Sequence, residues 1–184
     1  AQLVNLLYNL VDRVYVGHIP GEGAMALAGL GITFPVVIMV TAFSNLIGMG
    51  GASRASIVMG EGNRQQAEKI LGNCMFLVLV LSIALSAFFM LFKEPVLRAF
   101  GASDVTLPYA DDYLGVYLMG TFFVMAALSL NPFITNQGFA KTSMLTTCIG
   151  AVLNIALDPV FIYVLGMGVK GAAAATVISQ AVSA

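Results

Sequence analysis

Several long stretches of this sequence contain almost no charged residue, and they constrain the fold more than any other feature. A helix that crosses a bilayer needs roughly 20 predominantly apolar residues. The stretches of that length are 23–53, 70–92, 113–140 and 142–169, the last interrupted only by Asp158. Shorter apolar segments lie at both ends of the sequence, at 1–17 and 171–184. The sequence therefore predicts an all-α integral membrane protein.

The composition supports this prediction. Hydrophobic residues make up 59% of the chain and charged residues only 9%, whereas soluble domains contain roughly 25% charged residues. The net charge of −1 provides no basic field for nucleic acid, so no nucleic-acid partner is expected. Cys74 and Cys148 each lie inside an apolar stretch, and we interpret them as packed thiols rather than as part of a disulfide framework or a zinc site.

We place six membrane spans at about 1–17, 24–53, 70–92, 109–131, 142–165 and 171–184, within one bundle over residues 1–184. The first and last spans are short, and we interpret them as truncated helices. Asp111 and Asp112 follow Pro108 closely, in what we expect to be the first turn of a helix, where the helix dipole favours acidic side chains. We interpret this pair as a helix-start signal rather than as a catalytic dyad.

The connections between the spans fall into two groups. Residues 60–63 and 141 are expected on one side of the membrane, and residues 19–22, 102–104 and 167–170 on the other. The first group has slightly more lysine and arginine nearby, which mildly favours a cytoplasmic location for it.

Asp12 and Asp158 are acidic residues within predicted spans. A carboxylate at membrane depth costs about 2.5–3.5 kcal/mol or more, so it normally faces the protein interior or a water-filled cavity. Asp12 is adjacent to Arg13, but adjacent residues of a helix do not face each other, which makes a pairing between them poor. Asn5 and Asn9 share the helical phase of Asp12, so we expect a polar stripe on the first helix.

A second polar group lies in the fifth span. Asn154 and Asp158 are four residues apart and therefore share one helix face. Pro159 follows directly, and its ring and missing N–H leave the carbonyl of Ile155 without its usual helical partner. Carboxylate, amide and carbonyl oxygens together suit a small hard cation or a proton relay.

The Gly166–Gly171 segment matches the G-x-G-x-x-G pattern of dinucleotide-binding loops. The apolar residues before it belong to a predicted membrane span rather than to a strand. We therefore interpret the segment as a tight turn between two spans, and we expect no cofactor.

Four short segments resemble the multidrug and toxic compound extrusion (MATE) family of transporters. They are YNLVDRVYVG at 8–17, SRASIVMG at 53–60, NP at 131–132 and LNIALDP at 153–159. The resemblance covers nearly the whole chain and corresponds to the N-terminal half of the family.

The resemblance implies half of a twelve-helix transporter, in which two six-helix bundles surround a central cavity. It implies a cation-coupled antiporter, driven by H⁺ or Na⁺, that exports drugs or other organic and often cationic compounds. The protein would be a multi-pass protein of the cell membrane, which we expect to be a bacterial inner membrane. Its partners would be the small-molecule substrates, the lipid bilayer and the C-terminal half of the same transporter; the resemblance implies neither an enzyme nor a cofactor.

The resemblance also assigns roles to individual residues. Asp12, Asn154, Asp158 and Thr176 would form the cation- or proton-coupling site, and they would be the metal ligands if the ion is Na⁺. Tyr113 and Asn131 would belong to a supporting polar network. We add Asn9 to this network from its helical phase.

The coupling ion stays open between H⁺ and Na⁺. Two close carboxyl groups in a low-dielectric pocket cannot both ionise cheaply, so one of them can hold a proton. A sodium site would also need several oxygen ligands aligned at once. For that reason we favour the proton.

Two other functions compete with the antiporter. A lipid-linked oligosaccharide flippase of related architecture would need a larger and more basic cavity, and lysine and arginine are scarce in the predicted spans. A membrane enzyme acting on isoprenoid substrates would need aspartate-rich clusters to hold a metal diphosphate. Only Asp111 and Asp112 offer a start for such a cluster.

Overall fold

A computed structural model describes the backbone of residues 2–184 and the side chains from Leu10 onward. All regular elements in this described part are helical, which confirms the predicted all-α class. They are α1 (Gln2–Gly17), α2 (Gly23–Gly60), α3 (Arg64–Leu91), α4 (Lys93–Ala99), α5 (Leu107–Met119), α6 (Thr121–Asn136), α7 (Ala140–Pro159), the π-helix η1 (Val160–Val164) and α8 (Val169–Ser183).

Three of the described helical segments are long and apolar enough to cross a membrane, namely α2, α3 and α7 with its continuation η1. The α5–α6 pair passes the same test as one span that is bent by 61°. α1 and α8 have 16 and 15 residues, respectively, fewer than the roughly 20 residues of a full crossing. The prediction of six spans at the stated boundaries therefore stays a prediction.

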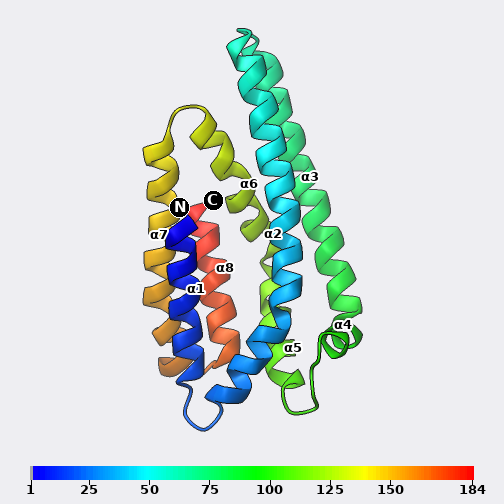
Figure 1. The fold of residues 1–184 in the computed structure, drawn as a ribbon, viewed down its shortest axis with the longest axis vertical. Helices are drawn as coiled ribbons and strands as arrows, with labels where there is room; N and C mark the ends of the chain where they lie inside the picture. Colours follow the sequence, from blue (N-terminus) through cyan, green and yellow to red (C-terminus); the bar gives the residue numbers. More distant parts are fainter. Residues whose placement is uncertain (1) are drawn as a thin grey trace.

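Figure 1 shows how the helices are arranged. α7 packs against α1 and α8, while α2 packs against α3 and α6. The α1–α2, α4–α5 and η1–α8 connections lie at one end of the molecule, and the α2–α3 and α6–α7 turns lie towards the opposite end (Figure 1). The two groups of connections are therefore separated as the sequence predicts.

Gly120 marks the bend between α5 and α6. A Cβ atom placed on this glycine would lie 2.1 Å from Cγ1 of Val177 in α8. The absence of a side chain therefore allows α8 to pack directly against the bend.

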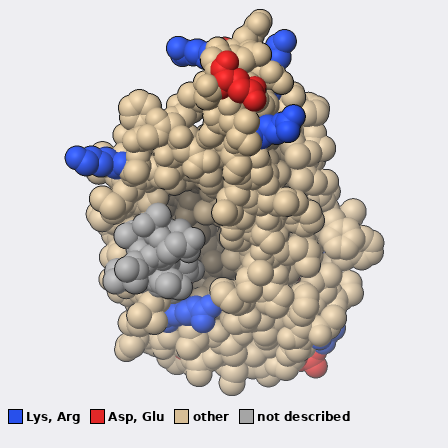
Figure 2. Space-filling model, turned by 45° about the horizontal axis from the view of Figure 1, so that its top comes forward, with Lys and Arg blue, Asp and Glu red and all other residues tan. Residues whose placement is uncertain are grey.

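The outer surface of the helices is rich in exposed apolar side chains, among them Leu46, Leu91 and Val164, each more than 70% exposed. Figure 2 shows charged side chains gathered around the α2–α3 end and a largely uncharged flank below it. Such a surface suits contact with lipid rather than with water.

Asp111 and Asp112 are both paired with lysine. Asp111 Oδ1 forms an ion pair with Lys93 Nζ at 2.9 Å, and Asp112 Oδ1 forms one with Lys170 Nζ at 3.2 Å. α5 begins at Leu107, so the two acids lie after its first turn, slightly later than the sequence predicts. Their pairing with lysines fixes the start of α5 against α4 and α8.

Candidate functional site

The residues predicted to form the coupling site come from three helices, with Asp12 on α1, Asn154 and Asp158 on α7, and Thr176 on α8. The exposed fractions of Asp12, Asn154 and Asp158 are 5%, 1% and 0%, and Thr176 is half-buried. The side chains of α7 can meet both groups because α7 lies in contact with α1 and with α8.

Asn154 is hydrogen-bonded both to Asp158 on its own helix and to α8. Asn154 Nδ2 lies 3.3 Å from Asp158 Oδ1 and 3.5 Å from Thr176 Oγ1, and it donates to both. The Thr176 hydroxyl itself donates to the carbonyl oxygen of Ala172 at 3.0 Å. The donors of this cluster are therefore used within it, which leaves acceptor oxygens available.

Three oxygens of the cluster are buried without a hydrogen-bond partner. They are Asp12 Oδ1, Asn154 Oδ1 and Asp158 Oδ2. Among the residues that the structure describes, the one further side-chain nitrogen or oxygen in this state is Ser179 Oγ. A buried polar group without a partner costs about 1–3 kcal/mol, and more when it is charged. A concentration of such oxygens at one place favours a bound proton, cation or water there.

The alternative in which Arg13 neutralises Asp12 does not match the observed positions. Arg13 is exposed, and its guanidinium carbon lies 5.0 Å from the centre of the Phe34 ring on α2. Asp12 is instead buried, and among the described residues no ion pair joins it to Arg13. Asp12 therefore has a buried carboxyl group that its neighbour in the sequence does not pair with.

The supporting residues lie in different surroundings. Tyr113 is buried in the main hydrophobic core together with Val16 and Ala172, and its ring stacks on Tyr117 with the ring centres 6.1 Å apart. The side chain of Asn9 lies outside the described residues, so its predicted place in the network stays a prediction.

Asn131 belongs to a polar network between α6 and the beginning of α7. Its Nδ2 donates to the carbonyl oxygen of Ser143 and to Thr147 Oγ1, each at 3.2 Å. The Ser143 hydroxyl donates back to Asn131 Oδ1, and Thr135 Oγ1 donates to the Ser143 hydroxyl at 2.7 Å. The hydrogen bonds of Asn131 therefore hold α6 against α7 instead of joining the carboxyl groups.

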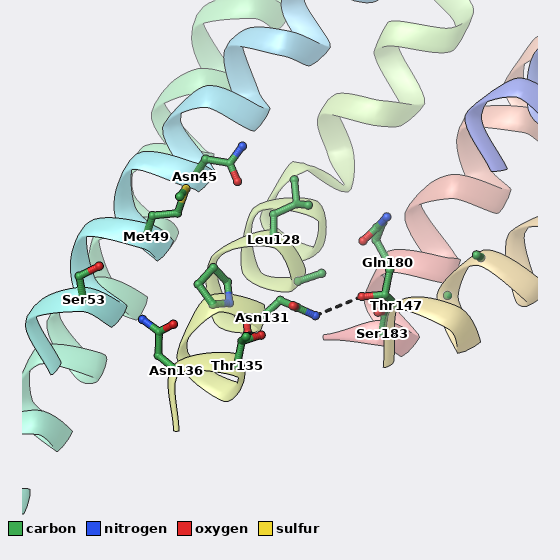
Figure 3. Close-up of a pocket in the computed structure, with 14 residues that line it drawn as sticks. Asn45, Met49, Ser53, Leu128, Asn131, Thr135, Asn136, Thr147, Gln180 and Ser183 are labelled. Atoms are coloured by element: carbon green, nitrogen blue, oxygen red, sulfur yellow. Dashed lines mark hydrogen bonds between the residues drawn. The ribbon is translucent and has the colours of Figure 1, made fainter. Parts of the chain in front are cut away.

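A cavity of about 340 Å³ adjoins this network. Figure 3 shows Asn45, Met49 and Ser53 of α2 on one side of it, Gln180 and Ser183 of α8 on the other, and Asn131 directed towards Thr147. The lining consists of uncharged residues: Asn45, Met49, Ser53, Ala127, Leu128, Asn131, Pro132, Thr135, Asn136, Thr147, Gly150, Ala151, Gln180 and Ser183.

Sequence reasoning identified only Asn131 among these lining residues. Asn45 and Gln180 also interrupt apolar stretches, and an amide within a span is itself a signal of a protein interior or a cavity. The same argument that identified the two aspartates could therefore have identified these two amides, whereas Asn136 lies beyond the predicted span 109–131.

The helix that contains Asp158 changes character directly after it. Pro159 ends α7, and the chain continues as the π-helix η1. The Tyr163 hydroxyl in η1 donates to the carbonyl oxygen of Tyr15 at 2.7 Å, and their rings meet edge to face. This contact holds α1 beside the α7–η1 junction, a kind of helix irregularity that is common at functional sites.

Comparison with known proteins was made against curated sequences and solved structures. A FAD transporter of Shewanella oneidensis is 27% identical over 180 residues, which cover 96% of this chain and 39% of that protein. Multidrug export protein MepA of Staphylococcus haemolyticus is 27% identical over 181 residues, which cover 98% of this chain and 40% of that protein.

Solved structures of transporters share the fold. The outward-facing conformation of a multidrug resistance MATE family transporter of the MOP superfamily has a TM-score of 0.90 and 32% identity, and the match covers 99% of this chain. An inward-facing conformation of such a transporter has a TM-score of 0.90 and 33% identity, and the match covers 96%. Each match covers 40% of the solved chain, so this chain spans about 40% of the length of the relatives that it matches.

A family model also matches most of this chain. The MatE model matches residues 1–160 of the 184-residue chain, and the predicted resemblance is thereby confirmed. The relatives are transporters, which excludes the predicted alternative of a membrane enzyme. This chain therefore belongs to the MatE family of multi-pass membrane transporters.

Proposed function

We propose that the complete transporter exports small organic compounds, and that a cation binding among Asp12, Asn154, Asp158 and Thr176 drives the export. The observation that supports this proposal most is the set of three partnerless buried oxygens on two helices, α1 and α7. Buried oxygens without a protein hydrogen-bond partner are costly, and binding of a positive ion or a proton relieves that cost. A site of this kind can therefore couple ion binding to a rearrangement of the helices.

The available donors are compatible with both candidate ions. A proton needs only one of the two neighbouring carboxyl groups, because like charges in a buried site disfavour full ionisation of the pair. Sodium would use Asp12 Oδ1, Asn154 Oδ1, Asp158 Oδ2 and the lone pairs of Thr176 Oγ1, with water completing the shell. We favour the proton because it requires fewer groups to be aligned.

The cavity is the proposed place where this part of the transporter contacts its substrate. Its amides and hydroxyls offer hydrogen bonds, and Met49 and Leu128 offer apolar contact. This combination suits a compact organic compound that is uncharged or that carries positive charge.

The lining also bears on two competing substrate classes. FAD, the substrate in the name of one relative, carries a diphosphate, and so does the lipid-linked oligosaccharide of a flippase. Diphosphate recognition normally uses arginine or lysine, and the cavity lining includes neither. The lining therefore favours an exporter of neutral or cationic compounds over either of these.

The test uses the purified full-length protein in liposomes loaded with a fluorescent cationic dye. Export is measured with a pH gradient alone, with a sodium gradient alone and with neither gradient. We expect the pH gradient alone to drive export, and FAD in place of the dye to be transported far more slowly. Export driven by sodium and not by the pH gradient would reverse the choice of ion, and export driven by neither would contradict cation coupling.

A further inference from the structure

The bend between α5 and α6 forms a socket for one side chain of α8. A Cβ atom placed on Gly120 would lie 2.1 Å from Cγ1, 2.4 Å from Cγ2 and 2.8 Å from Cβ of Val177. Because the Cβ atom of the valine is itself among these close atoms, rotation of its side chain could not relieve the contact. The space that a side chain at position 120 would need is therefore occupied by Val177.

A third helix supports the bend from another side. α5 ends at Met119 and α6 begins at Thr121, and carbonyl groups at the end of a helix lack a partner within it. The Ser86 hydroxyl on α3 donates to the carbonyl oxygen of Leu118 at 2.8 Å. The bend is thus held by a hydrogen bond from α3, while Val177 packs into it from α8.

Val177 directly follows Thr176, the residue of the coupling site on α8. Successive side chains of a helix point about 100° apart, so α8 can contact the bend with one of them and α7 with the other. Thr176 Oγ1 lies 3.5 Å from Asn154 Nδ2, which is at the long limit of a hydrogen bond. A bond of this length has little margin, so the exact place of α8 decides whether Thr176 can hold the amide of Asn154.

Other contacts fix α8 nearer its ends. Lys170 forms an ion pair near the start of the helix, and the Ser183 hydroxyl donates a hydrogen bond near its end. Each of these residues lies more than one turn from Thr176. Val177 is adjacent to Thr176, so its socket determines the place of the threonine more directly than either end does.

We infer that Gly120 and Val177 are positioning residues of the coupling site and that they act through Thr176; the inference rests on the proposed function. The amide nitrogen of Asn154 donates to Thr176 and to Asp158. When both N–H groups of an amide are held, the direction of its oxygen is held as well. Partners behind a ligand commonly orient it in this way. The socket therefore keeps Asn154 Oδ1, a buried oxygen without a partner, aligned for the cation.

The first test places a methyl group in the socket. In Gly120→Ala, the distance of 2.1 Å to Val177 must widen to at least 3.4 Å, where ordinary contact begins, so α8 is displaced. Export of the dye is measured with the full-length protein in liposomes, driven by H⁺, or by Na⁺ if sodium alone drives it. We expect the ion concentration for half-maximal export to rise at least about threefold and the corresponding dye concentration to stay within about twofold. A merely structural role would lower the amount of folded transporter and change neither concentration.

Two further variants control this test. Gly115→Ala on the same helix adds a methyl group 3.4 Å from Lys93 Nζ, the end of a flexible side chain, and should change neither concentration. Val177→Gly, combined with Gly120→Ala, removes all three of the close atoms. The combined variant should return the ion concentration to within about twofold of the unaltered value, since contacting residues are not additive. The same shift with and without Val177→Gly would overturn the socket.

A change on α3 tests the bend without adding an atom to it. Ser86→Ala removes the hydrogen bond to Leu118 and should also raise the ion concentration for half-maximal export. Ser82→Ala is the matched control, because Ser82 lies one turn earlier and its hydroxyl donates to the carbonyl oxygen of Leu79 in its own helix. Equal values for the two variants would overturn the role of the bend, and this comparison decides if Gly120→Ala does not fold.

A crystal structure of full-length Gly120→Ala gives a result that does not depend on transport. We expect Thr176 Oγ1 to lie beyond hydrogen-bond distance from Asn154 Nδ2. If that distance is unchanged, the positioning role is wrong even where an ion gradient drives export. If the distance increases as expected and neither gradient drives export by the unaltered protein, the coupling is wrong and the positioning of Thr176 stands.

Discussion

At the scale of single residues, Asp158 offers the sharpest test of the coupling site. Replacement by asparagine keeps the shape of the side chain and an acceptor for the amide of Asn154, now 3.3 Å away from Asp158, but it removes the charge. We expect gradient-driven export by Asp158→Asn to fall below about a tenth of the unaltered rate, because the change removes an interaction that the transport cycle requires. Export is measured in liposomes and folding by the thermal unfolding midpoint in detergent.

Asp112→Asn is the matched control for this change. Asp112 is also a carboxylate within a helix, α5, but it is paired with Lys170 and is partly exposed. Ion pairs of that kind contribute little to stability, so export should stay close to the unaltered rate. Full export by Asp158→Asn would make Asp158 a structural residue and would remove the basis of the proposed site.

The residues of the candidate site differ in how well the sequence reveals them. Asp12 and Asp158 are visible because a carboxylate within an apolar stretch is costly, and Asn154 is visible from its spacing to Asp158. Thr176 carries no such signal, because a hydroxyl is inexpensive in a membrane helix, and only the resemblance to the family pointed to it. Its hydrogen bond from Asn154 forms only when α7 and α8 are packed together.

At the scale of the helices, the contact between α2 and α6 depends on Gly48. A Cβ atom placed on Gly48 would lie 2.8 Å from both the Cα and the carbonyl oxygen of Ser129. Backbone atoms cannot move aside as a flexible side chain can, so α2 and α6 would have to separate. We expect Gly48→Ala to destabilise the protein by about 1–3 kcal/mol, as overpacking typically does, measured as a lower thermal unfolding midpoint of the full-length protein.

Gly50 provides the control within the same helix. A Cβ atom placed there has no neighbour within 4 Å, and alanine favours helix by up to about 1 kcal/mol over glycine. Gly50→Ala should therefore leave the midpoint unchanged or raise it slightly. If Gly48→Ala and Gly50→Ala had the same effect, close packing at Gly48 would not be what holds the two helices together.

The sequence predicts the apolar helices better than it predicts their breaks. The predicted span 109–131 is two helices that bend at Gly120, where Val177 from a distant part of the sequence packs against the bend. α2 continues past Arg54 to Gly60, since a charged residue near the end of a long helix need not end it when the residue can reach the polar side of the membrane. Local sequence contains neither piece of information.

At the scale of the whole molecule, charge and shape agree on how the bundle lies in a bilayer. The ion-paired residues Lys93, Asp111, Asp112 and Lys170 gather around the start of α5, near the end of the bundle that holds the η1–α8 connection (Figure 1). The exposed pair Arg64–Glu68 marks the opposite end. Between these ends the face in Figure 2 is largely uncharged, and many of the exposed side chains of the helices are apolar, so the axis that joins the two ends is the expected membrane normal.

This orientation leads to a labelling prediction. In the cysteine-free full-length protein, Glu61→Cys and Lys141→Cys should react with an impermeant maleimide from one side of the membrane only. Glu22→Cys, Asp104→Cys and Met167→Cys should react from the other side only. All five positions are exposed, and all lie in connections or at a helix end, so the substitutions should leave the packing intact.

The measurement compares intact cells with permeabilised cells. Because lysine and arginine slightly favour the side of residues 61 and 141, we expect these two positions to become reactive only after permeabilisation, as cytoplasmic residues do. Positions 22, 104 and 167 should react in intact cells. The reverse result would mean that the bundle has the opposite orientation in the membrane, with its architecture unchanged. Reaction of all five positions from one side would contradict the architecture itself. If every span crosses the membrane, successive connections between spans must lie on alternate sides of it.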